Sequence, residues 1–157
     1  MSTYLADTNI LVRWVQPRTA EHEQAVSAVE CLRRSGHTVL IAPQAVMEFW
    51  SVATRPAVAN GLGLSVEQTQ AEVLKVEGVF PLVPETPAVY DQWRRLVVQA
   101  DVTGPQVHDA RMVAIMLVHG ISHLLTCDLG HFRRYPSITV VHPAQIVAPD
   151  PSIDMSD

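Results

Sequence analysis

The sequence has little cysteine, almost no lysine and no long apolar run, and each shortage excludes a class of protein. Its two cysteines, Cys31 and Cys127, fit no zinc or redox spacing, which favours reduced thiols in the cytoplasm. No stretch approaches the roughly 20 apolar residues of a membrane-spanning helix. The N-terminus also lacks the basic and apolar segments of a signal peptide. We therefore expect a cytoplasmic protein without membrane contact.

Basic residues are also scarce, and the net charge is −5. Of the 11 basic residues one is a lysine, Lys75, and the rest are arginines. This balance argues against a protein that coats nucleic acid through bulk positive charge. It does not argue against a nuclease, because acids that hold a metal are part of the count. A few arginines can still grip phosphate groups bidentately.

What the chain does have is a 48% hydrophobic composition over 157 residues, enough for one full core. Short apolar segments predict about five strands: Thr3–Ala6, Thr38–Ala42, Phe80–Val83, Ser122–Thr126 and Ser137–Val141. Helices are predicted between them: Thr19–Ser35, Gln44–Thr54, Ser65–Glu77, Thr86–Ala100, and one that follows Gly104-Pro105 and runs to Gly120. This alternation predicts an α/β fold with a central parallel sheet and helices on both faces. We expect one domain over residues 1–143, followed by a flexible tail at 144–157.

Helix boundaries carry local signals. Gly36 ends the first predicted helix, and Pro43 suits the first turn of the second. Ser65 and Gln68 have the spacing of a capping box. Thr86, followed by proline, is predicted to cap the helix after it.

Four carboxylates lie where an α/β chain can gather them. Asp7 and Asp128 each end an apolar strand, and ligands of open parallel sheets bind beyond the carboxyl ends of the strands. Glu48 and Asp109 stand among apolar residues of predicted helices, Asp109 about one turn inside its helix. A buried acid needs a partner or a metal. Since no lysine is near them, the set predicts a site for a hard cation, Mg²⁺ or Mn²⁺.

Each acid also has a simpler interpretation. Asp7 could cap a helix that starts near Ile10, and Asp128 could be an ordinary turn residue. Glu48 could belong to a solvated helix stripe that also holds Gln44, Ser51 and Arg55. Asp109 could be a helix cap, although its apolar neighbours make this the weaker interpretation. The hypothesis therefore depends on the set of four and on no single member.

Other polar residues accompany the acids. Asn9 and Thr126 are candidates to orient a neighbouring carboxylate or a metal-bound water, with ordinary turn chemistry as the alternative. Arg111 and Arg13 are the candidates to contact a substrate phosphate. The histidines show no zinc spacing, and His108 is expected to be a packing or surface residue.

The motifs as a set resemble PIN-domain nucleases, most closely the VapC-like toxins of bacterial type II toxin–antitoxin pairs. The resemblance rests on Asp7-Thr8-Asn9 after the first strand, Glu48 in the helix after the second, His108-Asp109-Ala110-Arg111, and Thr126-Cys127-Asp128 with Phe132. It covers nearly the whole chain, from about Thr3 to Pro143.

The resemblance implies a PIN-like fold and a Mg²⁺- or Mn²⁺-dependent endoribonuclease, often a homodimer, that is neutralised by a small antitoxin. It maps the catalytic and metal-binding acids onto Asp7, Glu48, Asp109 and Asp128, with Asn9 and Thr126 in support. RNA as the substrate rests on this resemblance, because four acids alone do not distinguish RNA from DNA.

Two alternatives stay open. One is an α/β phosphohydrolase with an aspartyl nucleophile, but Asn9 stands where a second Asp is usual. The other is a catalytically silent PIN-like module that binds RNA, which the presence of all four acids disfavours.

Overall fold

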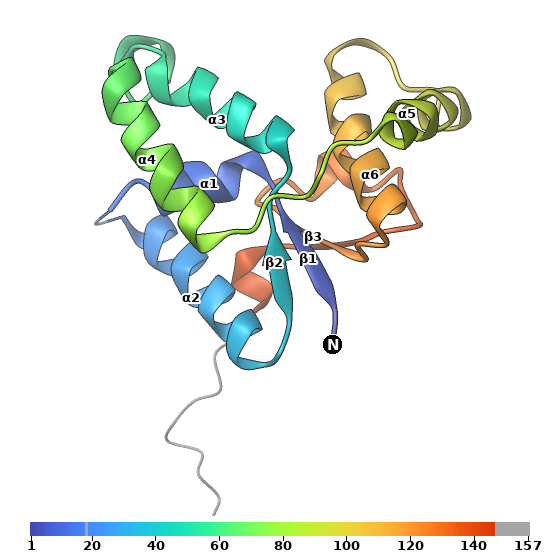
Figure 1. The fold of residues 1–157 in the computed structure, drawn as a ribbon, viewed down its shortest axis with the longest axis horizontal. Coiled ribbons are helices and arrows are strands. Elements are labelled where there is room, and N and C mark those ends of the chain that lie inside the picture. The colour runs from blue at the N-terminus through green and yellow to red at the C-terminus, as the bar shows by residue number, and fades with distance from the viewer. Residues whose placement is uncertain (18, 147–157) are drawn as a thin grey trace, which may run out of the picture.

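The computed structural model describes residues 1–17 and 19–146. A sheet of four parallel strands in the order β2-β1-β3-β4 runs through the middle of the molecule (Figure 1). The strands are β1 (Thr3–Ala6), β2 (Thr38–Leu40), β3 (His123–Leu125) and β4 (Thr139–Val141). The predicted α/β architecture with a parallel sheet is confirmed.

The carboxyl ends of β1, β3 and β4 are level with one another. Ala6 pairs with Leu125, and Leu125 pairs with Val141. Backbone hydrogen bonds continue one residue further, from Asp7 N to Leu125 O at 3.0 Å and from Thr126 N to Val141 O at 3.0 Å. The residues that follow β1 and β3 are therefore held side by side at one edge of the sheet.

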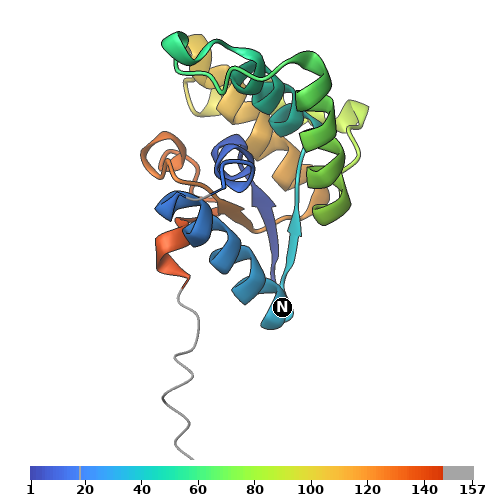
Figure 2. The same cartoon turned by 90° about the vertical axis from the view of Figure 1, so that its left-hand side faces the viewer.

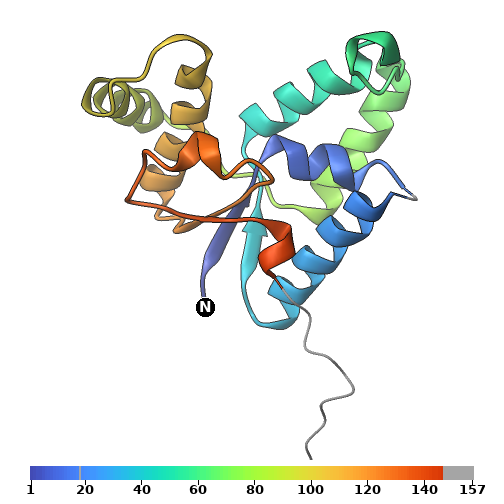
Figure 3. The same cartoon turned by 180° about the vertical axis from the view of Figure 1, so that it is seen from behind.

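Among the described residues, six α-helices surround the sheet. They are α1 (Thr8–Trp14), α2 (Ala20–Arg34), α3 (Pro43–Thr54), α4 (Val66–Val79), α5 (Pro87–Gln99) and α6 (Val107–His119). Opposite views place α2 on one side of the strands and α6 on the other (Figures 1 and 3). A side view shows α3 and α6 reaching beyond the carboxyl edge of the sheet (Figure 2). No helix among the described residues is both long and apolar enough to cross a membrane.

Several helix ends lie where the local signals place them. Thr19 caps α2, and Gly36, with a φ of 85°, follows its end. Ser65 and Gln68 form the predicted capping box of α4. Gly120 adopts a φ of 66° at the end of α6, a left-handed conformation that glycine reaches without strain.

The hydrophobic core lies directly behind the carboxyl edge. Ile10 and Leu11 of α1, Phe49 of α3, and Met112 and Met116 of α6 are all essentially inaccessible to solvent. Each of these helices is anchored by its apolar face, so its opposite polar face is fixed in position at the edge.

The prediction of a strand at Phe80–Val83 is wrong. This segment makes only an isolated parallel bridge, between Ile41 and Leu82. Helix α4 runs on to Val79, so Phe80 becomes its C-terminal cap, and Pro81 lacks the N–H that a strand would pair. The sheet therefore has four strands in place of about five.

Two smaller expectations also change. Helix α6 starts at Val107, so Asp109 lies in its first turn and not a turn further in. The side chain of Thr86 makes no capping hydrogen bond to α5. A 3-10 turn at Pro143–Gln145, beside the predicted domain boundary at 143, contacts α2, and the boundary itself stays a prediction. Residues 147–157 of the predicted tail lie outside the described residues.

Candidate active site

Asp7 is placed by the end of β1 and by the start of α1. Its side chain caps α1, with Oδ1 accepting a hydrogen bond from Thr8 N at 2.8 Å. Its Oδ2 accepts from the hydroxyl of Thr126 at 2.8 Å and from the amide of Asn9 at 3.4 Å. The residue is only 9% exposed. The cap interpretation of Asp7 is thus correct, and the same carboxylate also faces the polar cluster at the sheet edge.

Asn9 and Thr126 tie the ends of β1 and β3 together. Asn9 Nδ2 donates to Thr126 Oγ1 at 3.1 Å, and Cys127 N donates to Asn9 Oδ1 at 3.1 Å. Thr126 Oγ1 also accepts from Asp128 N at 3.1 Å. The buried hydroxyl therefore uses its one donor and both acceptor positions, which fixes Asp7 and the backbone of Asp128 relative to each other.

Glu48 is brought to the site by α3 and is half-buried. The hydroxyl of Thr8 donates to its Oε2 at 2.6 Å, and Gln44 Nε2 donates to its Oε1 at 2.9 Å. Gln44 itself is buried, and the same Nε2 donates to the backbone oxygen of His108 at 2.7 Å. Glu48 does not lie on a freely solvated helix face, because two neighbours hold both of its oxygens.

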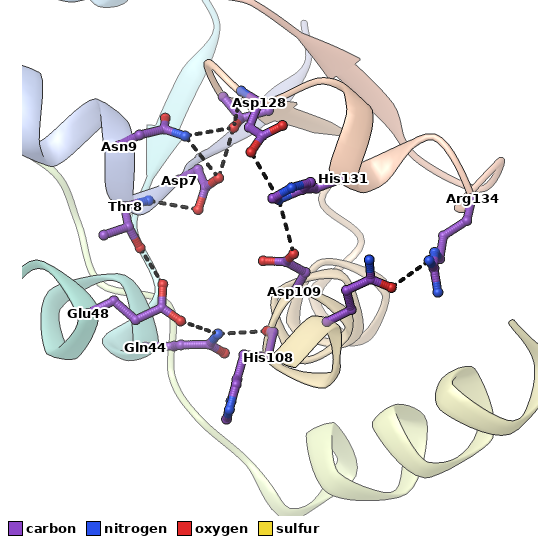
Figure 4. A network of polar contacts seen from close by, with 12 residues as sticks. Asp7, Thr8, Asn9, Gln44, Glu48, His108, Asp109, Asp128, His131 and Arg134 are labelled. Atoms are coloured by element: carbon purple, nitrogen blue, oxygen red, sulfur yellow. Dashed lines mark hydrogen bonds and ion pairs between the residues drawn. The ribbon is translucent and has the colours of Figure 1, made fainter. Parts of the chain in front are cut away.

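Asp109 and Asp128 face each other across an imidazole ring (Figure 4). His131 Nδ1 lies 2.9 Å from Asp128 Oδ2 and 3.6 Å from Asp109 Oδ2. The side chains of Asp109 and Asp128 are 32% and 45% exposed, so both remain open to solvent. The imidazole of His131 therefore lies between the two carboxylates.

All four acids line one cavity of about 420 Å³ at the carboxyl edge of the sheet. Arg13, Asn9 and His131 also line it, and no lysine does so among the described residues. The structure therefore brings Asp7, Glu48, Asp109 and Asp128 together from four separate segments of the chain.

Burial raises the pKa of two of the carboxylates, Asp7 and Asp109, and neighbouring acids add to the rise. The pKa of Asp7 rises from 3.8 to about 6, mainly through burial. The hydrogen bonds from Thr126 and Thr8 oppose this rise, while the charges of Glu48 and Asp109 add to it. Burial also raises the pKa of Asp109, and the charges of Glu48 and Asp128 raise it further, against His131. The site holds more negative charge than its own side chains neutralise, and a cation would relieve it.

The donor set suits a hard cation. The acids offer carboxylate oxygens, which Mg²⁺ and Mn²⁺ prefer over nitrogen or sulfur ligands. Among the described residues, no three acidic, histidine or cysteine side chains already converge as a closed metal cage. Mg²⁺ keeps several of its waters, so an open arrangement of acids around a hydrated ion agrees with its chemistry.

The two arginines predicted to contact phosphate lie in different places. Arg13 lines the cavity of the acids. Arg111 forms an ion pair with Glu85, and its Nη1 donates to Gln44 Oε1 at 3.2 Å. Arg111 therefore stands on the far side of Gln44 from the carboxylates, beside a neighbouring cavity. The phosphate contacts of both arginines stay predictions.

Two residues of the site escape the sequence interpretation. His131 is one of the histidines without zinc spacing, yet it follows Asp128 by three residues, which is the reach of one turn. Gln44 is one turn before Glu48, and sequence alone leaves open whether that stripe faces solvent or a cleft. The backbone partner of Gln44 is 64 residues away, so only the tertiary fold reveals it.

The comparisons with known proteins agree with this geometry. The chain matches the family model of the PIN domain over residues 4–137, and it belongs to the PIN domain family. No curated protein matches the chain.

Solved structures with the same fold include toxin–antitoxin assemblies. VapBC2 from Rickettsia felis, bound to a DNA fragment from its promoter, has a TM-score of 0.69 at 15% identity, covering 89% of this chain and 98% of that chain. A toxin–antitoxin complex from Klebsiella pneumoniae has a TM-score of 0.62 at 19% identity, with coverages of 89% and 97%. VapC20 from Mycobacterium tuberculosis, a sarcin–ricin loop cleaving toxin, has a TM-score of 0.55 at 18% identity, with coverages of 77% and 86%. The predicted PIN-like fold and its resemblance to VapC-like proteins are confirmed.

Proposed function

We propose that this PIN-domain protein is a divalent-metal-dependent endoribonuclease that acts as the toxin of a toxin–antitoxin pair. The observation that carries the proposal is the meeting of four carboxylates in one cavity, with the most buried of them, Asp7, at a raised pKa of about 6. Such a site suits hydrolysis of phosphodiester bonds better than it suits binding of RNA, because surplus negative charge repels phosphate unless a metal is present.

Asp7, Glu48, Asp109 and Asp128 would hold one or two Mg²⁺ or Mn²⁺ ions, which when bound lower the pKa of a coordinated water and neutralise the scissile phosphate. Asn9 and Thr126 hold the carboxylate of Asp7 in its direction through the hydrogen bonds already described. A fixed direction matters because a catalytic group that is misplaced by about 1 Å can slow a reaction roughly 100-fold.

The residues around the acids have roles of their own. Thr8 and Gln44 orient the two oxygens of Glu48. Arg13 lines the same cavity and is the residue we assign to a phosphate of the bound strand. His131 lies between Asp109 and Asp128 and provides a positive charge, when protonated, while no cation is bound.

RNA as the substrate follows from the VapC-like resemblance. It is supported by a structural neighbour that is described as a sarcin–ricin loop cleaving toxin. A small antitoxin as partner is supported by neighbours described as VapBC and toxin–antitoxin complexes. The same resemblance leads us to propose a homodimer that works in the cytoplasm.

A cleavage assay on mixed RNA tests the proposal. The wild-type chain should cleave RNA with Mg²⁺ or Mn²⁺ and not with excess EDTA, and Zn²⁺ should restore activity poorly because the ligands are oxygens. Asp109→Asn should lower the rate by at least about 100-fold, the scale on which catalytic acids and bases contribute. Asp91→Asn is the matched control, because Asp91 is exposed on α5 and lies outside the acid cavity. RNA binding without cleavage, or cleavage that persists after exhaustive chelation, would refute the proposal.

A further inference from the structure

A second cavity of about 440 Å³ lies between α5 and the start of α6, and the proposed cleavage chemistry does not use it. Its size falls in the range of sites that bind small organic groups. Its walls are mostly apolar and aromatic, with a few polar side chains among them. This composition suits a flat ring with polar edges better than it suits a purely aliphatic chain.

One wall of the cavity is a pair of aromatic rings. Tyr90 and Trp93 stack with centroids 6.1 Å apart and an angle of 29° between their planes. Trp93 Nε1 donates to the backbone oxygen of Val107 at 2.8 Å, which fixes the indole against α6. Tyr90 is 58% exposed, far more than a tyrosine whose task is to fill a core. The pair is thus a held aromatic wall in which Tyr90 is exposed, Trp93 is partly buried, and the Arg94 guanidinium lies 5.9 Å from the centroid of the Tyr90 ring.

The cavity also contains polar groups that suit the edge of a heterocycle. The hydroxyl of Thr86 is buried and has no hydrogen-bond partner among the described residues. This oxygen is closed to solvent, so the polar edge of the cavity comes from other side chains. Arg111 and Glu85, which form an ion pair, also line the cavity and add a guanidinium and a carboxylate.

The second cavity borders the acid site. His108 lines the aromatic cavity, while Asp109, the next residue, lines the acid cavity. Gln44 links the two cavities. Its Nε2 donates to Glu48 and to the backbone oxygen of His108, and its Oε1 accepts from Arg111. Figure 4 shows the His108 ring pointing away from the carboxylates. A bound chain could therefore reach both cavities at once.

We propose that the aromatic cavity binds one nucleobase of the RNA strand whose phosphate lies at the four acids. This inference rests on the proposed function. Single-stranded RNA is recognised mainly by stacking of splayed bases on aromatic rings and by hydrogen bonds to their edges. The stacked pair of Tyr90 and Trp93 provides the stacking surface, and the Glu85–Arg111 pair provides the polar groups for the base edge. The cavity thereby selects which nucleotide flanks the cleaved bond.

Kinetics on single-stranded RNA of random sequence test this assignment. Tyr90→Ala should raise KM by roughly 5- to 150-fold, the range for loss of one base–aromatic stack, with little change in kcat. Tyr90→Phe keeps the ring and should keep KM. Val98→Ala is the control, because Val98 is exposed on the same helix and does not line the cavity. Sequencing of the products should show a base preference beside the cut that Tyr90→Ala loses.

A fluorescence experiment reads the stacking directly. Short RNAs that carry 2-aminopurine at successive positions are titrated with the full-length Asp7→Asn variant, which should not cleave them. Stacking should quench the probe at one position only, and Asp7→Asn combined with Tyr90→Ala should abolish that quenching.

The possible failures are distinguishable. If the wild-type chain cleaves no RNA, the proposed function falls and this inference with it. If the wild-type chain cleaves RNA while Tyr90→Ala leaves KM, base preference and quenching unchanged, only the base site is wrong. If Tyr90→Ala instead converts a dimer to a monomer by light scattering, the cavity is an interface between copies, and the base site is likewise refuted.

Discussion

At the scale of single residues, Asp7 combines three tasks in one carboxylate. It caps α1, it accepts a bond from Thr126, and it contributes negative charge to the cavity. The first two tasks stabilise the fold, since caps and hydrogen bonds to charged groups each contribute about 1 kcal/mol or more. The third task opposes them, because burial and nearby acids disfavour the ionised form.

This opposition predicts how stability depends on pH. The pKa of Asp7 is higher in the folded chain, about 6, than its ordinary value of 3.8. The folded state therefore binds the proton more tightly, and the contribution of Asp7 to stability falls as pH rises from about 4 to 6. Asp7→Asn should remove this pH dependence. At pH 7 without metal it should also raise the free energy of unfolding by about 1 kcal/mol, because the gain from removing a buried charge exceeds the loss of the charge-assisted hydrogen bonds.

Urea unfolding of both proteins at pH 4, 5, 6 and 7 measures this difference. Asp91→Asn, which changes an exposed acid on α5, should follow the wild type at every pH. A difference between wild type and Asp7→Asn that stays constant from pH 4 to 7 would contradict the raised pKa.

The site residues differ in how far the sequence predicts them. Asp7 and Asp128 can be found because they end apolar strands, and parallel strands end at a common edge. Asp109 can be found as a candidate site residue as well, because its neighbours on the predicted helix are apolar. His131 cannot be found in this way, since its role depends on a turn that places its ring between Asp128 and an acid from another helix.

At the scale of elements, α3 connects the carboxyl edge of the sheet to α6. Gln44, 5% exposed, bonds Glu48 within α3, and the backbone of His108 and the side chain of Arg111 on α6. These bonds hold two helices that carry two of the four acids. Replacing a buried amide that has all of these partners by an apolar group lowers the stability of the protein, because the partners lose their hydrogen bonds.

Gln44→Leu should therefore destabilise the protein by about 1–3 kcal/mol, because the carbonyl of His108 and one oxygen of Glu48 lose their donor. Cleavage should also slow at temperatures where the variant is fully folded, since Glu48 is no longer held. Gln70→Leu, on the exposed face of α4, is the matched control and should change stability by less than about 0.5 kcal/mol. Equal stability of the two variants in urea titrations would refute the linking role of Gln44.

The elements themselves are largely predictable, and the exceptions have physical causes. Capping signals such as Ser65 with Gln68 are local, so they survive into the fold. The segment Phe80–Val83 has a strand-like composition, but Phe80 is the C-terminal cap of α4 and Pro81 interrupts the backbone hydrogen bonds of a strand. Thr86 has a capping residue's position, yet its hydroxyl turns into a buried setting and makes no cap.

At the scale of the whole molecule, the net charge is −5, and the four acids of the candidate site line one cavity. Binding of a divalent cation there should stabilise the fold by mass action, by about 2.7 kcal/mol at a concentration 100-fold above Kd. The gain should shrink as pH falls through about 6, because protons then compete for Asp7. Thermal unfolding with Mg²⁺ or Mn²⁺ at pH 7.5 and pH 5 tests this, with Asp7→Asn as the control that should show little metal response. A metal response that is the same at both pH values would contradict competition at Asp7.

The same surplus of negative charge leads us to predict how a partner would control the proposed nuclease. We expect an arginine of a small antitoxin to enter the cavity and pair bidentately with the carboxylates, which would block both metal and phosphate. Phe49 is fully buried and is excluded as a contact for the rest of such a partner. Trp14 and Trp50 are only partly buried, and Trp14 edges a small cavity together with Pro17 and Lys75. An amphipathic helix or extended segment could pack there while its basic residue reaches the acids.

We therefore predict that expression of this chain alone is toxic to a bacterial host and that co-expression of the neighbouring gene relieves the toxicity. Asp109→Asn should be harmless without the partner, because toxicity then depends on cleavage and not on binding. The purified complex should cleave RNA at least about 100-fold more slowly than the free chain, and replacing the partner's inserted arginine by alanine should restore activity even where the complex persists. Growth curves, cleavage rates and light scattering of the complex measure the three effects separately. A stable complex with full nuclease activity would show that the partner controls this protein somewhere other than at the four acids.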